Sequence, residues 1–93
     1  MMHLKKDNWK DSVSYFKRAI EIATEMNDQI RLAHFCFNLG KCYIEHEDFD
    51  NALKFVEKAV DTWYFVGKVP PNIGKTFDEL DNMVEELEDK IGF

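Results

Sequence analysis

Apolar residues recur every three or four positions along most of the chain, which is the spacing of one face of an α-helix. This pattern predicts helices over residues 9–26, 29–46, 49–66 and 76–91. The apolar side of the first helix carries Trp9, Val13, Phe16, Ala19, Ile20 and Ala23. The second carries Leu32, Phe35, Cys36, Leu39 and Tyr43, and the fourth carries Phe77, Leu80, Val84, Leu87 and Ile91. No segment alternates apolar and polar residues as a strand does, so we expect an all-α fold of four helices.

Residues that favour helix ends stand at the expected boundaries. Asn8, Asp28 and Asp48 are suited to cap the first three helices, because their side chains accept hydrogen bonds from free backbone N–H groups. Asn27 and Gly67 follow helix ends, where a left-handed backbone conformation is common. Residues 68–75, with two prolines and a glycine, predict a loop. Thr76 and Glu79 after it have the spacing of a capping box.

The first and third predicted helices repeat each other at a fixed offset along the chain. The matched pairs are Trp9/Phe49, Val13/Leu53, Tyr15/Phe55, Phe16/Val56, Ala19/Ala59 and Ile20/Val60. The helix ends match as well, Asn8 with Asp48 and Asn27 with Gly67. A fixed period of about 40 residues is typical of helical solenoids, in which each repeat packs on its neighbours.

The second and third helices together resemble one tetratricopeptide repeat (TPR). The residues that carry the resemblance are Leu39, Gly40, Tyr43, Phe49, Ala52 and Ala59. Cys36 departs from the pattern, and the period of about 40 residues exceeds the usual 34. Long repeats of this kind are similar to those of peptide-sensing quorum regulators of Gram-positive bacteria and of animal cell-polarity adaptors.

The resemblance implies a single domain over residues 1–93 that forms a TPR-like α-solenoid fragment. Residues 8–28 are the second helix of a partial repeat, and residues 29–67 are one full repeat. Residues 68–75 form the loop, and residues 76–91 form a C-terminal capping helix. Gly40 lies inside a helix, where glycine costs about 1 kcal/mol relative to alanine. We expect it to let the second helix approach Ala52, and also Ala59, closely.

In the TPR family the first helix of each repeat lines a concave groove, which implies a binding surface on the second helix here. Its residues are His34, Phe37, Asn38, Lys41 and Glu45, which share one helix face. The resemblance implies that Asn38 holds the backbone of an extended peptide, since its amide both donates and accepts hydrogen bonds. Lys41 is placed to meet an acidic group, and Phe37 is expected to be exposed.

Charge and composition restrict the classes of partner. Twelve basic against eighteen acidic residues give a net charge of −6, which disfavours nucleic acid and an anionic membrane surface. No apolar run approaches the ~20 residues of a membrane span. Cys36 and Cys42 are six positions apart on one helix, about 9 Å, which is too far for a disulfide and favours a reduced, cytoplasmic protein.

Candidate chemistry is sparse. Cys42 and His46 could face one metal ion, but two ligands make a weak zinc site. Cys36 is interpreted as buried packing, and the acidic run of the fourth helix as a solvated face. No catalytic motif stands out. We therefore expect no metal, no cofactor and no catalysis.

The chain starts with the second helix of a repeat, so either it is a fragment or a second copy covers the open side. From this we predict a homodimer through the first helix, with Trp9, Val13, Phe16 and Ile20 as the self-association face. The leading hypothesis is a non-enzymatic scaffold that binds a protein or peptide. The alternatives are a structural or truncated fragment that only self-associates, and a peptide-responsive regulatory subunit.

Overall fold

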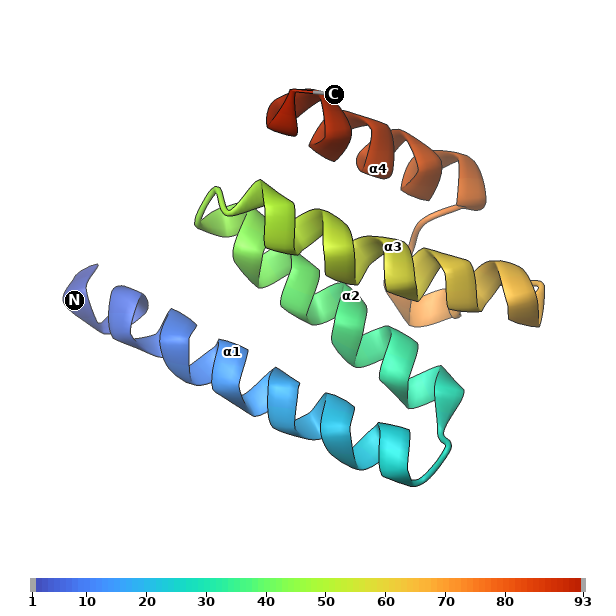
Figure 1. The fold of residues 1–93 in the computed structure, drawn as a ribbon, viewed down its shortest axis with the longest axis horizontal. Coiled ribbons are helices and arrows are strands. Elements are labelled where there is room, and N and C mark those ends of the chain that lie inside the picture. The colour runs from blue at the N-terminus through green and yellow to red at the C-terminus, as the bar shows by residue number, and fades with distance from the viewer. Residues whose placement is uncertain (1, 93) are drawn as a thin grey trace.

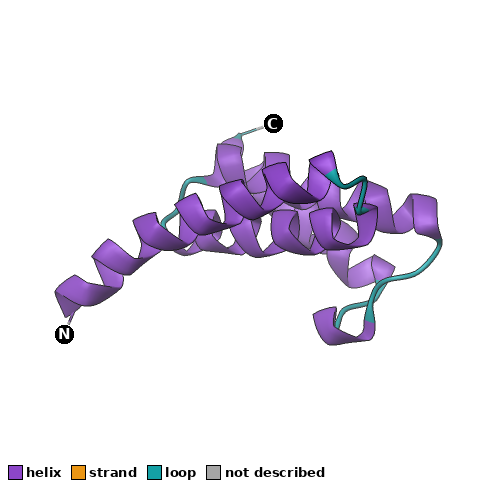
Figure 2. Ribbon diagram, turned by 90° about the horizontal axis from the view of Figure 1, so that it is seen from below, coloured by secondary structure: helices purple, strands orange, loops and turns teal. Residues whose placement is uncertain are grey.

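Four antiparallel helices pack one after another in the computed structural model, which describes the backbone of residues 2–92 and the side chains of residues 9–92. These residues form α1 (Met2–Glu25), α2 (Gln29–Glu45), α3 (Phe49–Val66) and α4 (Phe77–Ile91), with a 3₁₀ helix, η1 (Pro71–Ile73), before α4. Contacts run between consecutive helices: α1 with α2, α2 with α3, and α3 with α4 (Figure 1). Short loops join the first three helices, and a longer segment leads to α4 (Figure 2). The all-α prediction is confirmed.

The turns after α1 and α2 have the same geometry. Asn27 and Glu47 both adopt left-handed backbone angles, with φ of 58° and 59°. The next residue, Asp28 or Asp48, accepts a hydrogen bond on its side chain from Arg31 N at 3.2 Å or Asn51 N at 3.4 Å. A helix and the turn that follows it therefore make up half of one repeat. Two such helix–turn units in succession make up the repeat period predicted from the sequence. The sequence pattern indicated Asn27 but not Glu47, because glutamate has no preference for this conformation.

The start of α1 corrects one prediction. Asn8 was expected to cap the helix, but α1 begins at Met2, so Asn8 lies inside it. Residues 2–7 contain neither proline nor glycine and include methionine, leucine and two lysines, which are good helix formers. The helix continues through a polar residue because nothing before Asn8 stops it.

The end of α3 and the start of α4 confirm the remaining predictions of helix boundaries. Gly67 has φ of 99°, and its N–H donates to Trp63 O at 2.8 Å. Thr76 Oγ1 accepts from Glu79 N at 3.2 Å, while Glu79 Oε1 accepts from Thr76 N at 2.9 Å. This reciprocal pair closes the capping box and fixes where α4 starts. The predicted loop 68–75 contains η1.

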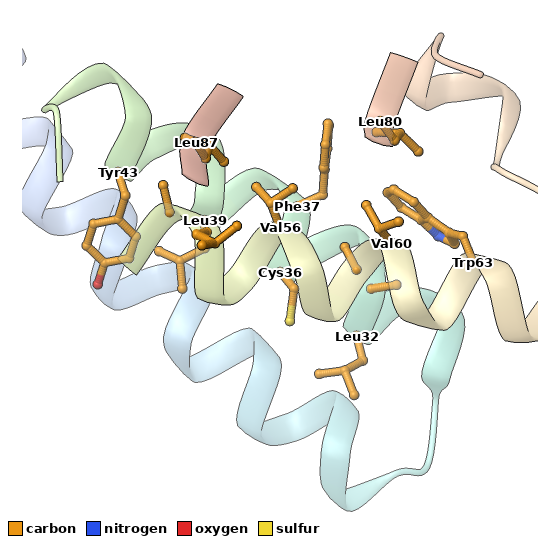
Figure 3. Close-up of a cluster of buried hydrophobic side chains, with 14 of the residues drawn as sticks. Leu32, Cys36, Phe37, Leu39, Tyr43, Val56, Val60, Trp63, Leu80 and Leu87 are labelled. Atoms are coloured by element: carbon orange, nitrogen blue, oxygen red, sulfur yellow. The ribbon is translucent and has the colours of Figure 1, made fainter. Parts of the chain in front are cut away.

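The core is continuous through the stack, because α2 and α3 are each covered on two sides. Trp63 on α3 is fully buried and lies 5.4 Å from the ring of Phe37 on α2. Leu80 and Leu87 of α4 close the core from the other side (Figure 3). The largest fully buried side chains are Trp63, Phe37, Leu39, Leu80, Val56 and Cys36. The indole Nε1 of Trp63 has no hydrogen-bond acceptor among the described residues.

Gly40 marks the closest approach of α2 and α3. A Cβ at this position would lie 2.5 Å from Val56 Cγ2 and 3.3 Å from both Ala52 O and Val56 N. The close approach predicted for Gly40 against Ala52 is confirmed, and the nearest atom of α3 belongs to Val56. Any side chain at residue 40 would push against the backbone of α3, which explains a glycine in mid-helix.

Candidate protein-binding groove

A groove of about 550 Å³ lies between α2 and α4. We call it the α2–α4 groove, and its described lining residues are Lys41, Ile44, Glu45, Lys75, Glu79, Asn82, Met83 and Glu86. α2 and α4 are each packed on α3, and their backbones stand apart from one another. Two helices that share a neighbour and stand apart leave a concave surface between them. The groove is therefore produced by the stacking, not by a loop.

The groove combines an apolar floor with charges of both signs. Ile44 and Met83 are half-buried and supply the apolar surface. Lys41 and Lys75 contribute positive charge, and Glu45, Glu79 and Glu86 contribute negative charge. All five charged side chains are exposed and remain hydrated, and all except Glu79, which is bonded to Thr76 N, are free to pair with a ligand. Such a lining suits a segment of polypeptide with an apolar side chain flanked by charged or amide groups.

Phe37 was predicted to be exposed in the groove, and that prediction is wrong. Its ring is only 2% exposed and packs against Trp63. The sequence argument treated α2 as a helix with one buried side, but α2 lies between α1 and α3 and has two. Lys41 Nζ lies 5.6 Å above the ring centroid of Phe37. Phe37 therefore does not line the groove. Its buried ring makes a cation–π contact with Lys41, which does line it.

The remaining residues of the predicted surface are divided by the structure. Lys41 and Glu45 line the α2–α4 groove. His34 and Asn38 are half-buried and lie outside the described lining of the groove. The α4 side of the groove was missed altogether. A signal for it existed, because α4 follows a complete repeat and so occupies the place of the next repeat's first helix.

The predicted self-association face is also corrected. Trp9, Val13, Phe16 and Ile20 pack against the core. Trp9 lies 5.9 Å from the ring of Tyr43 on α2, and Phe16 lies 6.4 Å from the ring of Phe35. These side chains serve the α1–α2 contact within one chain. Among the described side chains, the large apolar residues that stay exposed on this side are Tyr15 and Ile22 of α1 and Met26 in the turn after it.

The cysteines show no sign of activation. Cys36 is fully buried, and burial raises the pKa of its thiol, against a smaller opposing effect of Lys58. Burial, followed by the charge of Glu45, raises the pKa of Cys42, while Lys41 lowers it. A raised pKa reduces the thiolate fraction, so both thiols are poor nucleophiles. Both are free, which fits their predicted separation.

His46 stacks on Trp9 with 4.1 Å between ring centroids, so its ring is held by α1. Within the described residues, no group of three or more His, Cys, Asp or Glu side chains is placed to hold a metal ion. The contact with Trp9 of α1 explains His46 as a packing residue, and Cys42 is a half-buried free thiol on α2.

A second hollow, of about 290 Å³, lies between α3 and α4. Tyr64 Oη donates a hydrogen bond to Asp81 Oδ2 at 2.7 Å, and this bond is the main cause of the raised pKa of Tyr64. Glu57, also in this hollow, has a pKa raised by partial burial and then by the negative charges of Glu88 and Asp61. The hollow is acidic, and the hydrogen bond across it fastens α4 to α3.

Stacked antiparallel helices with a recurrent turn and a groove between alternate helices define an α-helical repeat protein. Residues 33–62, which span most of α2 and α3, match the sequence model of the tetratricopeptide repeat family. The chain therefore contains a tetratricopeptide repeat, as the sequence pattern over residues 29–67 indicated. No curated protein and no solved structure matches the chain. None of the helices in the described part of the chain is long and apolar enough to cross a membrane.

Proposed function

We propose that this chain is a non-enzymatic, cytoplasmic scaffold that binds a segment of another protein in the α2–α4 groove. The observation that carries the proposal is the groove itself, which lies beside a tetratricopeptide repeat and has an apolar floor between two lysines and three carboxylates. The two free thiols support a reducing compartment. The raised thiol pKa values of Cys36 and Cys42 support binding over nucleophilic catalysis.

The ligand that suits this lining is an extended peptide with one apolar residue. Ile44 and Met83 receive the apolar side chain, Lys41 and Lys75 pair with its acidic groups, and Asn82 bonds its backbone. Methionine adapts its shape to different apolar side chains, so the groove accepts related sequences. His34 and Asn38 extend the same side of α2 and would meet the flanks of a longer peptide.

A test begins with a library of random peptides displayed on phage, selected on the wild-type chain. Selected peptides are then measured against Lys41→Glu and against Lys17→Glu. Both substitutions change the net charge equally at exposed positions, but only Lys41 lines the groove. We expect Lys41→Glu to weaken binding at least about tenfold, because it reverses a charge that faces the ligand, and Lys17→Glu to leave it unchanged.

Equal affinity for the two variants would place the peptide elsewhere and overturn the groove as the site. Thermal melts of both variants check that each is folded. A second candidate function is self-association as a homodimer, which the exposed apolar side chains of Tyr15 and Ile22 on α1 and of Met26 just after it favour.

A further inference from the structure

The exposed side of α1 carries the same surface that α3 uses to pack on α2. On α3, Phe55 stacks on Tyr43 of α2 at 5.9 Å, and Ala52 O lies beside Gly40. The equivalent positions of α1, one repeat period earlier, are Ser12 for Ala52, Tyr15 for Phe55 and Ala19 for Ala59. Together with Ile22, and with Met26 in the turn directly after α1, they form what we call the α1 outer face. By its pattern, this face is a helix-packing surface.

The α1 outer face is uncovered in the single chain. Tyr15 is 65% exposed, Ile22 is 49% exposed and Met26 is 67% exposed. Two hollows accompany these side chains. One of about 170 Å³ lies beside Ala19 and Ile22 and reaches Arg31 on α2, and one of about 360 Å³ lies beside Ser12 and Tyr15. Large apolar side chains that flank small residues are arranged to receive the ridge of another helix.

The spacing of these residues makes the face complementary to itself. Tyr15 and Met26 are centred on the same point of α1 as Ala19 and Ile22, between Ile20 and Glu21. If two copies of α1 lie antiparallel about this point, Tyr15 of each copy meets Met26 of the other. Ala19 then meets Ile22 of the other copy, and the small alanine lets the helices approach closely. A two-fold contact requires this kind of self-complementarity.

The charges beside the face fit the same arrangement. Asp11, Arg18 and Glu25 are exposed and follow each other at intervals of seven, so they lie along one flank of α1. In an antiparallel helix pair related by a two-fold axis, the same flanks of the two helices meet. Arg18 of each copy then lies about 3 Å along the helix axis from the position opposite Glu25 of the other, within reach of these long side chains. The contact gains two equivalent ion pairs.

Stacking of α1 on α4 of another copy is disfavoured by comparison. The exposed residues of α4 include Asp78, Glu85, Glu86 and Asp89. An acidic helix surface offers no apolar cover for Tyr15, Ile22 and Met26, and it would oppose Asp11 and Glu25 with like charges. The α1 outer face is therefore matched to its own copy better than to the other end of the molecule.

We propose that two copies of this chain associate through their α1 outer faces, antiparallel and two-fold symmetric. Apolar contacts of Tyr15, Ala19, Ile22 and Met26 form the centre, and Arg18–Glu25 pairs flank it. This dimer develops the second candidate function given above and rests on it. Its surface is different from the α2–α4 groove, so peptide binding in the groove and dimerisation can be tested separately. The dimer would place two grooves in one assembly and so raise the avidity for a partner with two binding segments.

Analytical ultracentrifugation over a concentration series tests the proposal on the full chain. Arg18→Glu and Glu25→Arg should each raise the dissociation constant about tenfold, because every reversal acts at two symmetric contacts. The double variant Arg18→Glu/Glu25→Arg should restore it to near the wild-type value. These side chains are exposed, so the substitutions leave the fold intact.

A matched pair of variants locates the interface. Ile22→Lys should abolish the dimer, whereas Phe65→Lys should leave it unchanged, although Phe65 on α3 is 90% exposed and thus the more exposed residue. A wild-type chain that stays monomeric at its solubility limit overturns the proposal. So does a dimer that survives Ile22→Lys, or one whose double charge variant is no tighter than the single variants. Circular dichroism verifies that each variant is helical.

Discussion

α1 and α3 share a residue pattern but differ in what covers them. Phe55 of α3 stacks on Tyr43, while its equivalent in α1, Tyr15, is 65% exposed. Ala59 is fully buried between helices, while Ala19 borders a surface hollow. Trp63 fills the core, whereas the equivalent residue in α1 is the small Ala23. The two helices have the same amphipathic design, and their positions in the stack decide which side is buried.

The comparison shows that a repeat pattern specifies which surfaces of a helix can pack, but not whether another helix covers each of them. α3 lies between two neighbours and uses both of its apolar sides. α1 packs on one described neighbour and leaves the second side to solvent. The same substitution should therefore have a large effect on α3 or on its contact with α2, and a small effect on the folding of α1.

The largest effect should follow Gly40→Leu at the closest point of the α2–α3 contact. We expect the free energy of unfolding to fall by about 2–3 kcal/mol, because the new side chain meets the Val56 methyl group and the α3 backbone. Urea denaturation measures this change. The smaller substitution Gly40→Ala should also lower the free energy of unfolding. This loss should be smaller in a protein that already carries Val56→Ala, because that change removes the Cγ2 contact. A Gly40→Leu variant as stable as wild type would contradict the close approach of the two helices.

Removing the equivalent aromatic rings of α3 and α1 should change the free energy of unfolding by different amounts. Phe55→Ala should lower the free energy of unfolding by about 1–2 kcal/mol, because the half-buried ring loses its stacking on Tyr43. Tyr15→Ala should change it by less than about 0.5 kcal/mol when measured at concentrations below those of dimerisation. Equal costs at both positions would show that the side chain of Tyr15 is covered in the single chain.

A smaller and pH-dependent effect is expected at Glu57 on the α3–α4 side, whose equivalent position on α1 is Lys17. Its pKa is raised above the ordinary 4.5 by partial burial, then by Glu88 and Asp61. Between the ordinary and the raised pKa, the folded state binds more protons than the unfolded state, so stability falls as the pH rises through this window. Glu57→Gln should therefore be slightly more stable than wild type at pH 7.

The gain should disappear at pH values below the ordinary pKa, where the carboxyl group is protonated in both states. Urea denaturation at a series of pH values measures the difference between the two proteins. Removing the charge of Glu88 with Glu88→Gln should shift the stability in the same direction. A difference that is constant with pH would contradict the assigned cause.

Local signals predicted the elements and most of their ends. Asp28, Asp48, Gly67 and the Thr76–Glu79 capping box work over three or four residues, so their roles follow from neighbouring sequence alone. Asn8 failed as a cap because a suitable residue caps only where a helix starts, and nothing before it ends the helix. Of the residues that the sequence predicted for the binding surface, Lys41 and Glu45 line the α2–α4 groove, whereas Phe37 is buried in the core.

The sequence by itself determined the helices, the repeat period and the meaning of Gly40, because hydrogen bonding and apolar spacing within a helix are local. Only the tertiary structure decided which apolar sides are covered. It buried Phe37 between α2 and α3, turned Trp9 and Phe16 toward α2, and left Tyr15, Ile22 and Met26 outside. The physical reason is that burial depends on how many neighbours a helix has, and a residue pattern records a surface fit for packing without stating what packs on it.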